Sequence, residues 1–254
     1  MTITFLGTGT SQGIPVIACP CEVCHSLDFR DKRLRTSIHL QQGNTSVVID
    51  TGPDFRQQML RENVQHLDAL LFTHEHKDHT AGMDDVRAFN FKQQCDMPLY
   101  AEPRVIEQLR MEFSYVFSEK KYPGVPRVQT FPINEHDDIA IGEFTFTPIR
   151  VMHYKLPVLG FRTGDFTYIT DANHISDSEK EKIKGSKILI LNALQKDDHI
   201  SHFNLDQAIA LAQEIGAETT YFTHISHRMG LHADVEKELP DGIELAYDGL
   251  SLSI

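Results

Sequence analysis

The sequence predicts an α/β sandwich in which strands and helices form layers. Short apolar runs rich in β-branched residues alternate along the chain with segments of helical periodicity. Several of these apolar runs end directly in a histidine or an aspartate. No low-complexity tract, charge block or linker rich in Pro, Gly and Ser divides the 254 residues, so we expect one domain over 1–254.

The expected strands are distributed over the whole chain. Residues 1–13, MTITFLGTGTSQG, begin with an alternating β-branched pattern that is typical of a strand, and they lack the basic leading region of a signal peptide. Similar apolar runs predict further strands, at 45–52 with its closing turn, 67–73, 144–153, 165–171, 187–194 and 219–224.

The helical patterns fall between these strands. Residues 53–64 carry Pro53 near their start, where the first turn of a helix tolerates proline. Residues 80–92 and 178–184 also show a helical period. The segment 204–216 begins with Asn204 and has a glutamine three residues later, a spacing that predicts a capping box.

Charge and composition narrow the function classes. The formal net charge of -12 opposes binding of a long nucleic acid, because such binding depends on clustered Lys and Arg. No apolar run is long enough to cross a bilayer. We therefore expect a cytoplasmic protein with a small substrate, without a long nucleic acid or a membrane as its partner.

Four expected strands run into a residue that can bind a metal. These residues are His74, His153, Asp171 and His224. In layered α/β folds, functional groups gather beyond the strand ends, where the sheet fixes the backbone and the loops leave room for a substrate. The four endings therefore predict one shared site.

The segment THEHKDHTAG concentrates metal-ligand side chains directly after a buried strand. Imidazole and carboxylate groups suit Zn or Mn, and a turn leaving a strand allows His74 and His76 to face one ion while Asp78 and His79 face another. A polar turn that is rich in histidine by chance is the alternative, and it does not account for the spacing HxHxDH.

With this motif the chain resembles the metallo-β-lactamase superfamily over essentially its whole length. The resemblance implies an αββα sandwich, in which two mixed β-sheets are flanked by helices. It also implies two divalent cations, Zn or Mn, that share Asp171: His74, His76 and His153 hold the first ion, and Asp78, His79 and His224 hold the second. Asp50 matches an early aspartate of the superfamily that hydrogen-bonds to a ligand, although an Asp before Gly is also typical of a turn.

The expected chemistry follows from the paired charges. Two ions roughly 3.5–4 Å apart lower the pKa of a bridging water and stabilise the oxyanions of an in-line displacement. The metal-bridging hydroxide is then the nucleophile, and we count Asp78 as catalytic through its ion. His202, just before the capped helix, is the candidate general acid for the leaving oxygen, although a helix-entry histidine bonded locally is equally typical.

A second metal site is expected in a loop at about 18–27. Cys19, Cys21 and Cys24 form a CxCxxC run whose thiolates can reach one tetrahedral ion, and a structural Zn is the first choice. The fourth ligand is His227, three residues beyond His224, or alternatively His25. The fourth cysteine, Cys95, stands alone and is expected to be a buried small residue.

The cysteine cluster, the late His227 and the opening FLGTGTSQGIPV resemble the PhnP-like phosphodiesterases. That resemblance implies a homodimer and a small, possibly cyclic, ribose phosphodiester as substrate. Arg35, Ser37 and Arg87, with Thr36 beside them, are weaker candidates for donors to phosphate oxygens.

Three other activities share parts of this pattern. A tRNase Z-like nuclease usually adds a basic arm, which is not visible in the sequence. A thioester or lactone hydrolase would carry HxHxDH but gives no reason for the cysteines. A PqqB-like accessory protein without hydrolytic activity shares the cysteine cluster but departs from the full set of ligands, which is complete in this sequence.

Overall fold

The computed structural model describes residues 1–120 and 122–254 and contains two mixed β-sheets. The first sheet is built from β1 (Thr2–Gly7), β2 (Ser37–Gln42), β3 (Thr45–Ile49), β4 (Ala69–Leu71), β5 (Met97–Ala101), β6 (Val128–Pro132) and β15 (Ser251–Ser253). The second contains β7 (Ile139–Ile141), β8 (Phe144–His153), β9 (Leu156–Thr163), β10 (Phe166–Tyr168), β11 (His174–Ile175), β12 (Ile188–Asn192), β13 (Thr219–Thr223) and β14 (Ile243–Leu245).

Each sheet has an antiparallel part and a parallel part. The order of the first is β15-β1-β2-β3-β4-β5-β6, and the strands are parallel from β3 onward. The order of the second is β11-β8-β9-β10-β12-β13-β14, with β7 paired to β8, and the strands are parallel from β10 onward. The carboxyl ends of the parallel strands therefore lie along one edge of each sheet.

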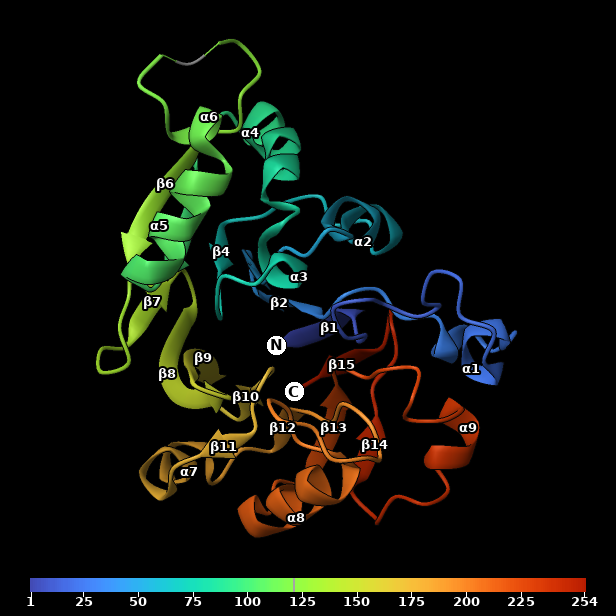
Figure 1. Ribbon diagram of the computed structural model, residues 1–254. Helices are drawn as coiled ribbons and strands as arrows, with labels where there is room; N and C mark the ends of the chain where they lie inside the picture. Colours follow the sequence, from blue (N-terminus) through green and yellow to red (C-terminus); the bar gives the residue numbers. More distant parts are fainter. Residues whose placement is uncertain (121) are drawn as a thin grey trace.

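Helices cover the outer faces of the two sheets (Figure 1). The α-helices are α1 (Glu22–His25), α2 (Phe55–Arg61), α3 (Lys77–Thr80), α4 (Arg87–Gln93), α5 (Pro103–Glu112), α6 (Ser114–Phe117), α7 (Asp177–Ile183), α8 (Leu205–Ile215) and α9 (His232–Val235). Two short 3₁₀ helices are η1 (Phe29–Asp31) and η2 (Met83–Val86). The predicted αββα sandwich is confirmed.

Alternation along the strands separates the core into layers. Val47 and Ile49 of β3 face the second sheet and pack with Phe146 and Phe161, whereas Val48 packs against the outer helices. This period of two is what a strand buried on both faces requires. The sheet-to-sheet layer thus holds together the two halves that carry the expected metal ligands.

Most expected elements are present, with shorter bounds. The strand at 144–153 is β8 in full, and the capping box of α8 is confirmed by Asn204 Oδ1, which accepts from Gln207 N at 2.8 Å. The helical pattern at 80–92 is divided between η2 and α4. A Cβ at Gly82, which precedes η2, would lie 2.2 Å from the carbonyl oxygen of Gly52, so this close approach of two backbone segments requires glycine.

Candidate metal centres

Side chains from both sheets converge beyond the strand ends in two groups of possible metal ligands. In each group the ligand atoms lie within 4.8 Å of one another. The groups are His74, His76 and His153, and Asp78, His79, Asp171 and His224; a further set, His153, Asp171 and His202, overlaps with both. The structure therefore brings together all the residues that the sequence assigned to the two cations, from segments more than a hundred residues apart.

Asp171 lies between the two groups. Its Oδ2 is 3.1 Å from His79 Nε2, and its Oδ1 is 3.2 Å from His224 Nε2 and 4.0 Å from His153 Nε2. On the other side of the second group, Asp78 Oδ2 is 3.3 Å from His79 Nε2. One carboxylate thus faces imidazoles of both groups, which is the position required of a bridging ligand.

The backbone at three of the strand ends is left-handed. Asp50, Asp171 and His224 have φ values of 65°, 54° and 57°. Non-glycine residues adopt this region rarely and at a cost, and such residues cluster at functional sites. The sharp turn at each position directs the side chain back across the strand ends toward the shared centre.

Asp50 contacts the nitrogen of His79 that faces away from the centre. Its Oδ2 accepts from His79 Nδ1 at 2.7 Å, and both side chains are fully buried. Thr73 in turn donates its N–H to Asp50 Oδ1 at 2.9 Å and its hydroxyl to Oδ2 at 2.8 Å. These bonds leave Nε2 of His79 as the atom that faces the centre, which agrees with the supporting position expected for Asp50.

The structure also shows contacts that orient the proposed ligands and that the sequence did not predict. His153 Nδ1 donates to the Ser201 carbonyl at 2.8 Å, which turns Nε2 of the ring toward the first group. A threonine directly precedes three strand-end ligands, in the pairs Thr73–His74, Thr170–Asp171 and Thr223–His224. The Thr170 hydroxyl donates to Asp171 Oδ2 at 2.7 Å. The repeated threonine was a signal that could have identified this support.

The nitrogen atoms at the centre fit a cation. Within the described part of the chain, Nε2 of His74, His79 and His224 is buried without a hydrogen-bond partner. Buried polar atoms rarely remain unpaired, and imidazole nitrogens are preferred ligands of Zn and related ions. Because carboxylates of Asp78 and Asp171 lie among these nitrogens, the donor set suits divalent cations.

The electrostatics of the two groups agree with this fit. Burial and the His79 ring lower the pKa of His74, so its lone pair is free to bind a metal. Burial also opposes charge on His79, but Asp171, Asp78 and Asp50 outweigh that effect and raise its pKa. Burial likewise opposes the charge of Asp171, yet the His224 and His79 imidazoles hold its pKa well below the usual range. The second group thus concentrates negative charge that a cation would neutralise.

His202 lies directly beside this centre. Its Nδ1 is 3.9 Å from Asp171 Oδ1, and its ring stacks on His224 with centroids 4.7 Å apart. Burial, followed by the charge of His224, lowers the pKa of His202 to about 2. The ring is therefore neutral near pH 7 and keeps one transferable proton, and Nδ1 has no hydrogen-bond partner among the described residues.

The weaker phosphate candidates have partners in the protein. Ser37 donates to the Asp50 carbonyl at 2.8 Å, Thr36 donates to the Gly9 carbonyl at 2.8 Å, and the Arg87 guanidinium pairs with Asp84. Arg35 Nε lies 3.3 Å from Asp54 Oδ2, and its guanidinium would contact a Cβ at Gly13. Arg35 and Thr36 both contact the loop that follows β1, Arg35 beside Gly13 and Thr36 at Gly9.

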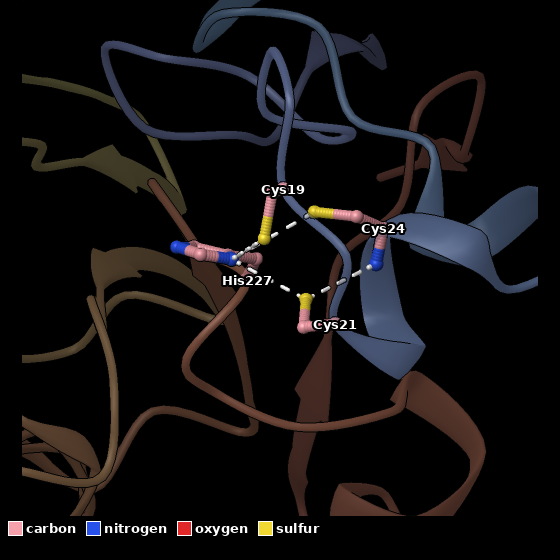
Figure 2. A group of neighbouring side chains, drawn as sticks. All are labelled: Cys19, Cys21, Cys24 and His227. Carbon is pink, nitrogen blue, oxygen red and sulfur yellow. Dashed lines mark hydrogen bonds between the residues drawn. The ribbon is translucent and has the colours of Figure 1, made fainter.

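The cysteine loop forms a separate centre with His227 (Figure 2). Nδ1 of His227 lies 3.2 Å from Cys19 Sγ, 3.4 Å from Cys21 Sγ and 3.7 Å from Cys24 Sγ. A tetrahedron with Zn–S bonds of about 2.3 Å and Zn–N bonds of about 2.0 Å has S···N edges of about 3.5 Å. The four side chains are spaced as a tetrahedral zinc site requires.

His25 does not join this centre. Its Nδ1 lies 3.1 Å from the Cys21 carbonyl oxygen, and the ring is exposed at the end of α1. Within the centre, the N–H of Cys24 lowers the pKa of the Cys21 thiol to about 6, against the opposing effect of burial and with help from His227. Cys21 therefore has the thiolate character that a zinc ligand needs.

The expectation for Cys95 was wrong, because this cysteine is exposed. It lies in the turn between α4 and β5, after Gln94, whose φ is 57°. Asn90 Nδ2 donates to the Cys95 carbonyl at 3.0 Å. The backbone of Cys95 is thus held by the turn while its side chain points outward.

Comparison with known proteins identifies the fold family. Residues 45–225 match the family model described as the beta-lactamase superfamily domain. The chain belongs to the metallo-β-lactamase superfamily. A crystal structure of a diphosphatase from the PhnP family is similar to it, with 39% identity, a TM-score of 0.93 and coverage of 100% of this chain and 97% of the other. The predicted superfamily and PhnP-like group are confirmed.

Two curated proteins are also similar to this chain. An octanoyltransferase from Porphyromonas gingivalis is 37% identical over 256 residues, which are 100% of this chain and 52% of that protein. The chain thus spans about half the length of that relative. A ribonuclease Z from Deinococcus radiodurans is 29% identical over 119 residues, or 46% of this chain and 35% of the relative.

The described residues contain no helix whose length and apolar character would allow it to cross a membrane.

Proposed function

We propose that this superfamily member is a metal-dependent phosphodiesterase that acts on a small phosphodiester. The observation that carries the proposal is the position of Asp171, whose two carboxylate oxygens face imidazoles of both ligand groups. Two cations held there would supply an activated water and would neutralise charge on phosphate oxygens. The PhnP-family diphosphatase and the ribonuclease Z, which act on phosphorus esters by their names, support the reaction class.

The chain's own residues supply binding and orientation in this proposal. His74, His76 and His153 would hold the first cation, Zn or Mn. Asp78, His79 and His224 would hold the second, and Asp171 would contact both. His76 is the exposed member of these groups, so a substrate would approach past its ring.

His202 is placed to handle the leaving group. In its neutral form it can hold one proton beside the reacting phosphate, and the negative charge of a bound phosphodiester would favour uptake of a second. We propose that His202 donates that proton to the departing alkoxide oxygen. Arg35, in the loop before β2, would contribute to phosphate binding. Ser37 and Arg87 are weaker candidates for phosphate contacts, because both already bind partners within the protein.

Charge and domain organisation complete the proposal. The net charge of -12 favours a small substrate over a long nucleic acid. Because the ligand groups draw on both sheets, residues 1–254 would act as one domain, with a structural zinc in the cysteine loop. A cytoplasmic homodimer remains part of the proposal by analogy with the PhnP-like group.

Acyl transfer or acyl-ester hydrolysis is the competing reaction, favoured by the octanoyltransferase name of one relative. A screen of initial rates separates these activities. The full chain, supplied with zinc and manganese separately, is offered cyclic and linear phosphodiesters, diphosphate diesters, octanoyl thioesters, lactones and RNA. Turnover of the small phosphorus esters far above the others is expected, whereas turnover of acyl esters alone would overturn the proposal.

Metal analysis tests the non-hydrolytic alternative. A phosphodiesterase of this design retains about three ions per chain, whereas a PqqB-like accessory protein with only the cysteine site retains about one. Elemental analysis of the purified chain, repeated after Asp78→Ala, distinguishes the two cases.

A further inference from the structure

An arginine outside both ligand groups connects the two sheets beside the first group. Arg104 lies in the first turn of α5, on the outer face of the first sheet (Figure 1). Its Nη1 pairs with the Glu75 carboxylate, and its Nη2 donates to the Pro157 carbonyl at 2.7 Å. One planar guanidinium therefore binds the loop after β4 and the strand β9 at the same time.

Both contacts lie close to ligands of the first group, one along the chain and the other across a strand pair. Glu75 stands between His74 and His76 in the sequence. Pro157 is paired in register with Met152, the residue before His153. Arg104 thus contacts Glu75, which lies between His74 and His76, and Pro157, which lies across from the residue before His153.

This arrangement matters because those imidazoles come from different sheets. His74 and His76 follow β4 of the first sheet, whereas His153 ends β8 of the second. Their mutual distance therefore depends on how the two sheets are fixed to each other at this edge. A backbone bond from Leu159 N to the Thr73 carbonyl, at 3.1 Å, is a second link at the same place.

The Glu75 carboxylate also needs a partner. The side chain is only 19% exposed, and its Oε2 has no hydrogen-bond partner within the described residues. Because it neighbours two ligands, Glu75 without its cation partner would be a nearby anion that competes for the metal. Glu102, which precedes α5, lies 3.7 Å from Arg104 and pairs with Arg150 of β8.

We propose that Arg104 is a positioning residue for the first cation, holding the HxHxDH loop and the β8–β9 hairpin at the separation that three-imidazole binding requires. The proposal rests on the proposed dinuclear site. Supporting contacts behind metal ligands typically change metal affinity by roughly 10–100-fold. We expect the metal affinity of the first group to change by that factor, whereas the metal affinities of the second group and of the cysteine centre should stay unchanged.

Manganese binding tests the proposal without relying on turnover. Mn²⁺ prefers imidazole and carboxylate over thiolate ligands, so the electron paramagnetic resonance signal of free Mn²⁺ reports the active-site groups and not the cysteine centre. Arg104→Met keeps the length of the side chain and removes its donors. The titration of the unchanged chain should show two binding phases, one for each ion. In Arg104→Met the Mn²⁺ affinity of one phase should fall roughly 10–100-fold, and activity should recover at high Mn²⁺.

Matched variants make the result specific. Arg110→Met lies on the same helix, where Arg110 contacts Phe117 and Thr130, and it should bind both ions as the unchanged chain does. Glu75→Gln should weaken the same phase, and the double variant should lose less than the sum of the single losses. Two unchanged binding phases in Arg104→Met, with or without a lower melting temperature, would overturn the proposal.

The unchanged chain separates this inference from the function on which it rests. If it binds no Mn²⁺ and elemental analysis finds no zinc beyond that of the cysteine centre, the dinuclear function itself is wrong, and the role of Arg104 is excluded with it. If it binds two ions and Arg104→Met does so equally well, only the role of Arg104 fails.

Discussion

Asp50 and His79 form a fully buried pair, with Asp50 Oδ2 accepting from His79 Nδ1 at 2.7 Å. Substituting Asp50→Asn removes the charge that fixes the ring and its tautomer. We expect the affinity of the second ligand group for Mn²⁺ to fall roughly 10–100-fold. Manganese titration measures this affinity. The control is Asp68→Asn, which changes a carboxylate at the opposite end of β3, where Asp68 Oδ2 accepts from Ser46 N. Equal affinities in both variants would exclude the supporting role.

Asp78→Ala would remove a proposed ligand of the second ion and nothing from the core. We expect phosphodiester hydrolysis to be abolished while the circular dichroism spectrum and cooperative melting are retained, because the side chain points into the centre. His79→Ala should have the same effect on activity. Asp96→Ala, at an exposed turn, should retain full activity. Wild-type rates in Asp78→Ala would remove the dinuclear mechanism.

Cys21→Ser removes one thiolate from the cysteine centre. Since zinc binding at such a site contributes to folding free energy, the variant should melt several degrees lower and lose its zinc, while kcat at low temperature changes little. Differential scanning calorimetry with zinc analysis measures both. The exposed Cys95 provides a matched control in Cys95→Ser. An unchanged melting temperature in Cys21→Ser contradicts a structural zinc.

His202→Ala should separate substrates by their leaving groups. A missing general acid costs roughly 10²–10⁴-fold in kcat for alkoxide leaving groups, whereas nitrophenolate departs without a proton. Rates for a nitrophenyl diester and an alkyl diester, measured in the same preparation, give the ratio. Losses of equal size on both substrates exclude proton donation and leave His202 a purely structural role.

His39 predicts a loss of stability in acid, away from the metal centres. Burial lowers its folded pKa from 6.5 to about 4, so between these values the unfolded chain takes up a proton that the folded chain does not. Stability attributable to this residue is therefore complete above pH 6.5 and falls toward pH 4, by at most on the order of 3 kcal/mol.

Urea unfolding at pH 7 and pH 5 checks this effect. His39→Gln keeps a polar partner for Ser46, whose hydroxyl lies 2.8 Å from the ring, and it should lose less stability between the two pH values than the unchanged chain. His136→Gln, at an exposed position, should behave like the unchanged chain. The same pH dependence in all three proteins would refute the assignment to His39.

Local patterns were sufficient to predict which side chains meet at the candidate site. HxHxDH after an apolar run, together with strand endings at His153, Asp171 and His224, predicted one shared site, and the resemblance to the superfamily divided these residues into two ligand groups. This was effective because strands and their ends are local in sequence, and the sheet aligns the ends at one edge. The capping spacing at Asn204 was equally local.

Contacts between distant segments could not be predicted in this way. His227 was the first candidate for the fourth ligand and His25 its rival, and the choice depends on how the segment after β13 places the later histidine beside the cysteine loop. Arg104 carries no motif, and its contacts with Glu75 and Pro157 exist only because α5 and the two sheets meet. Cys95 looked like a core residue until the turn around it was known.

The left-handed turns at Asp50, Asp171 and His224 set a limit on engineering this scaffold. Glycine adopts these backbone angles without penalty, so exchanging any of the three would relax the turn. The same exchange deletes a carboxylate or an imidazole on which metal binding depends. Selection for thermal stability alone would therefore favour inactive variants. A screen for more stable variants needs a readout that depends on metal binding.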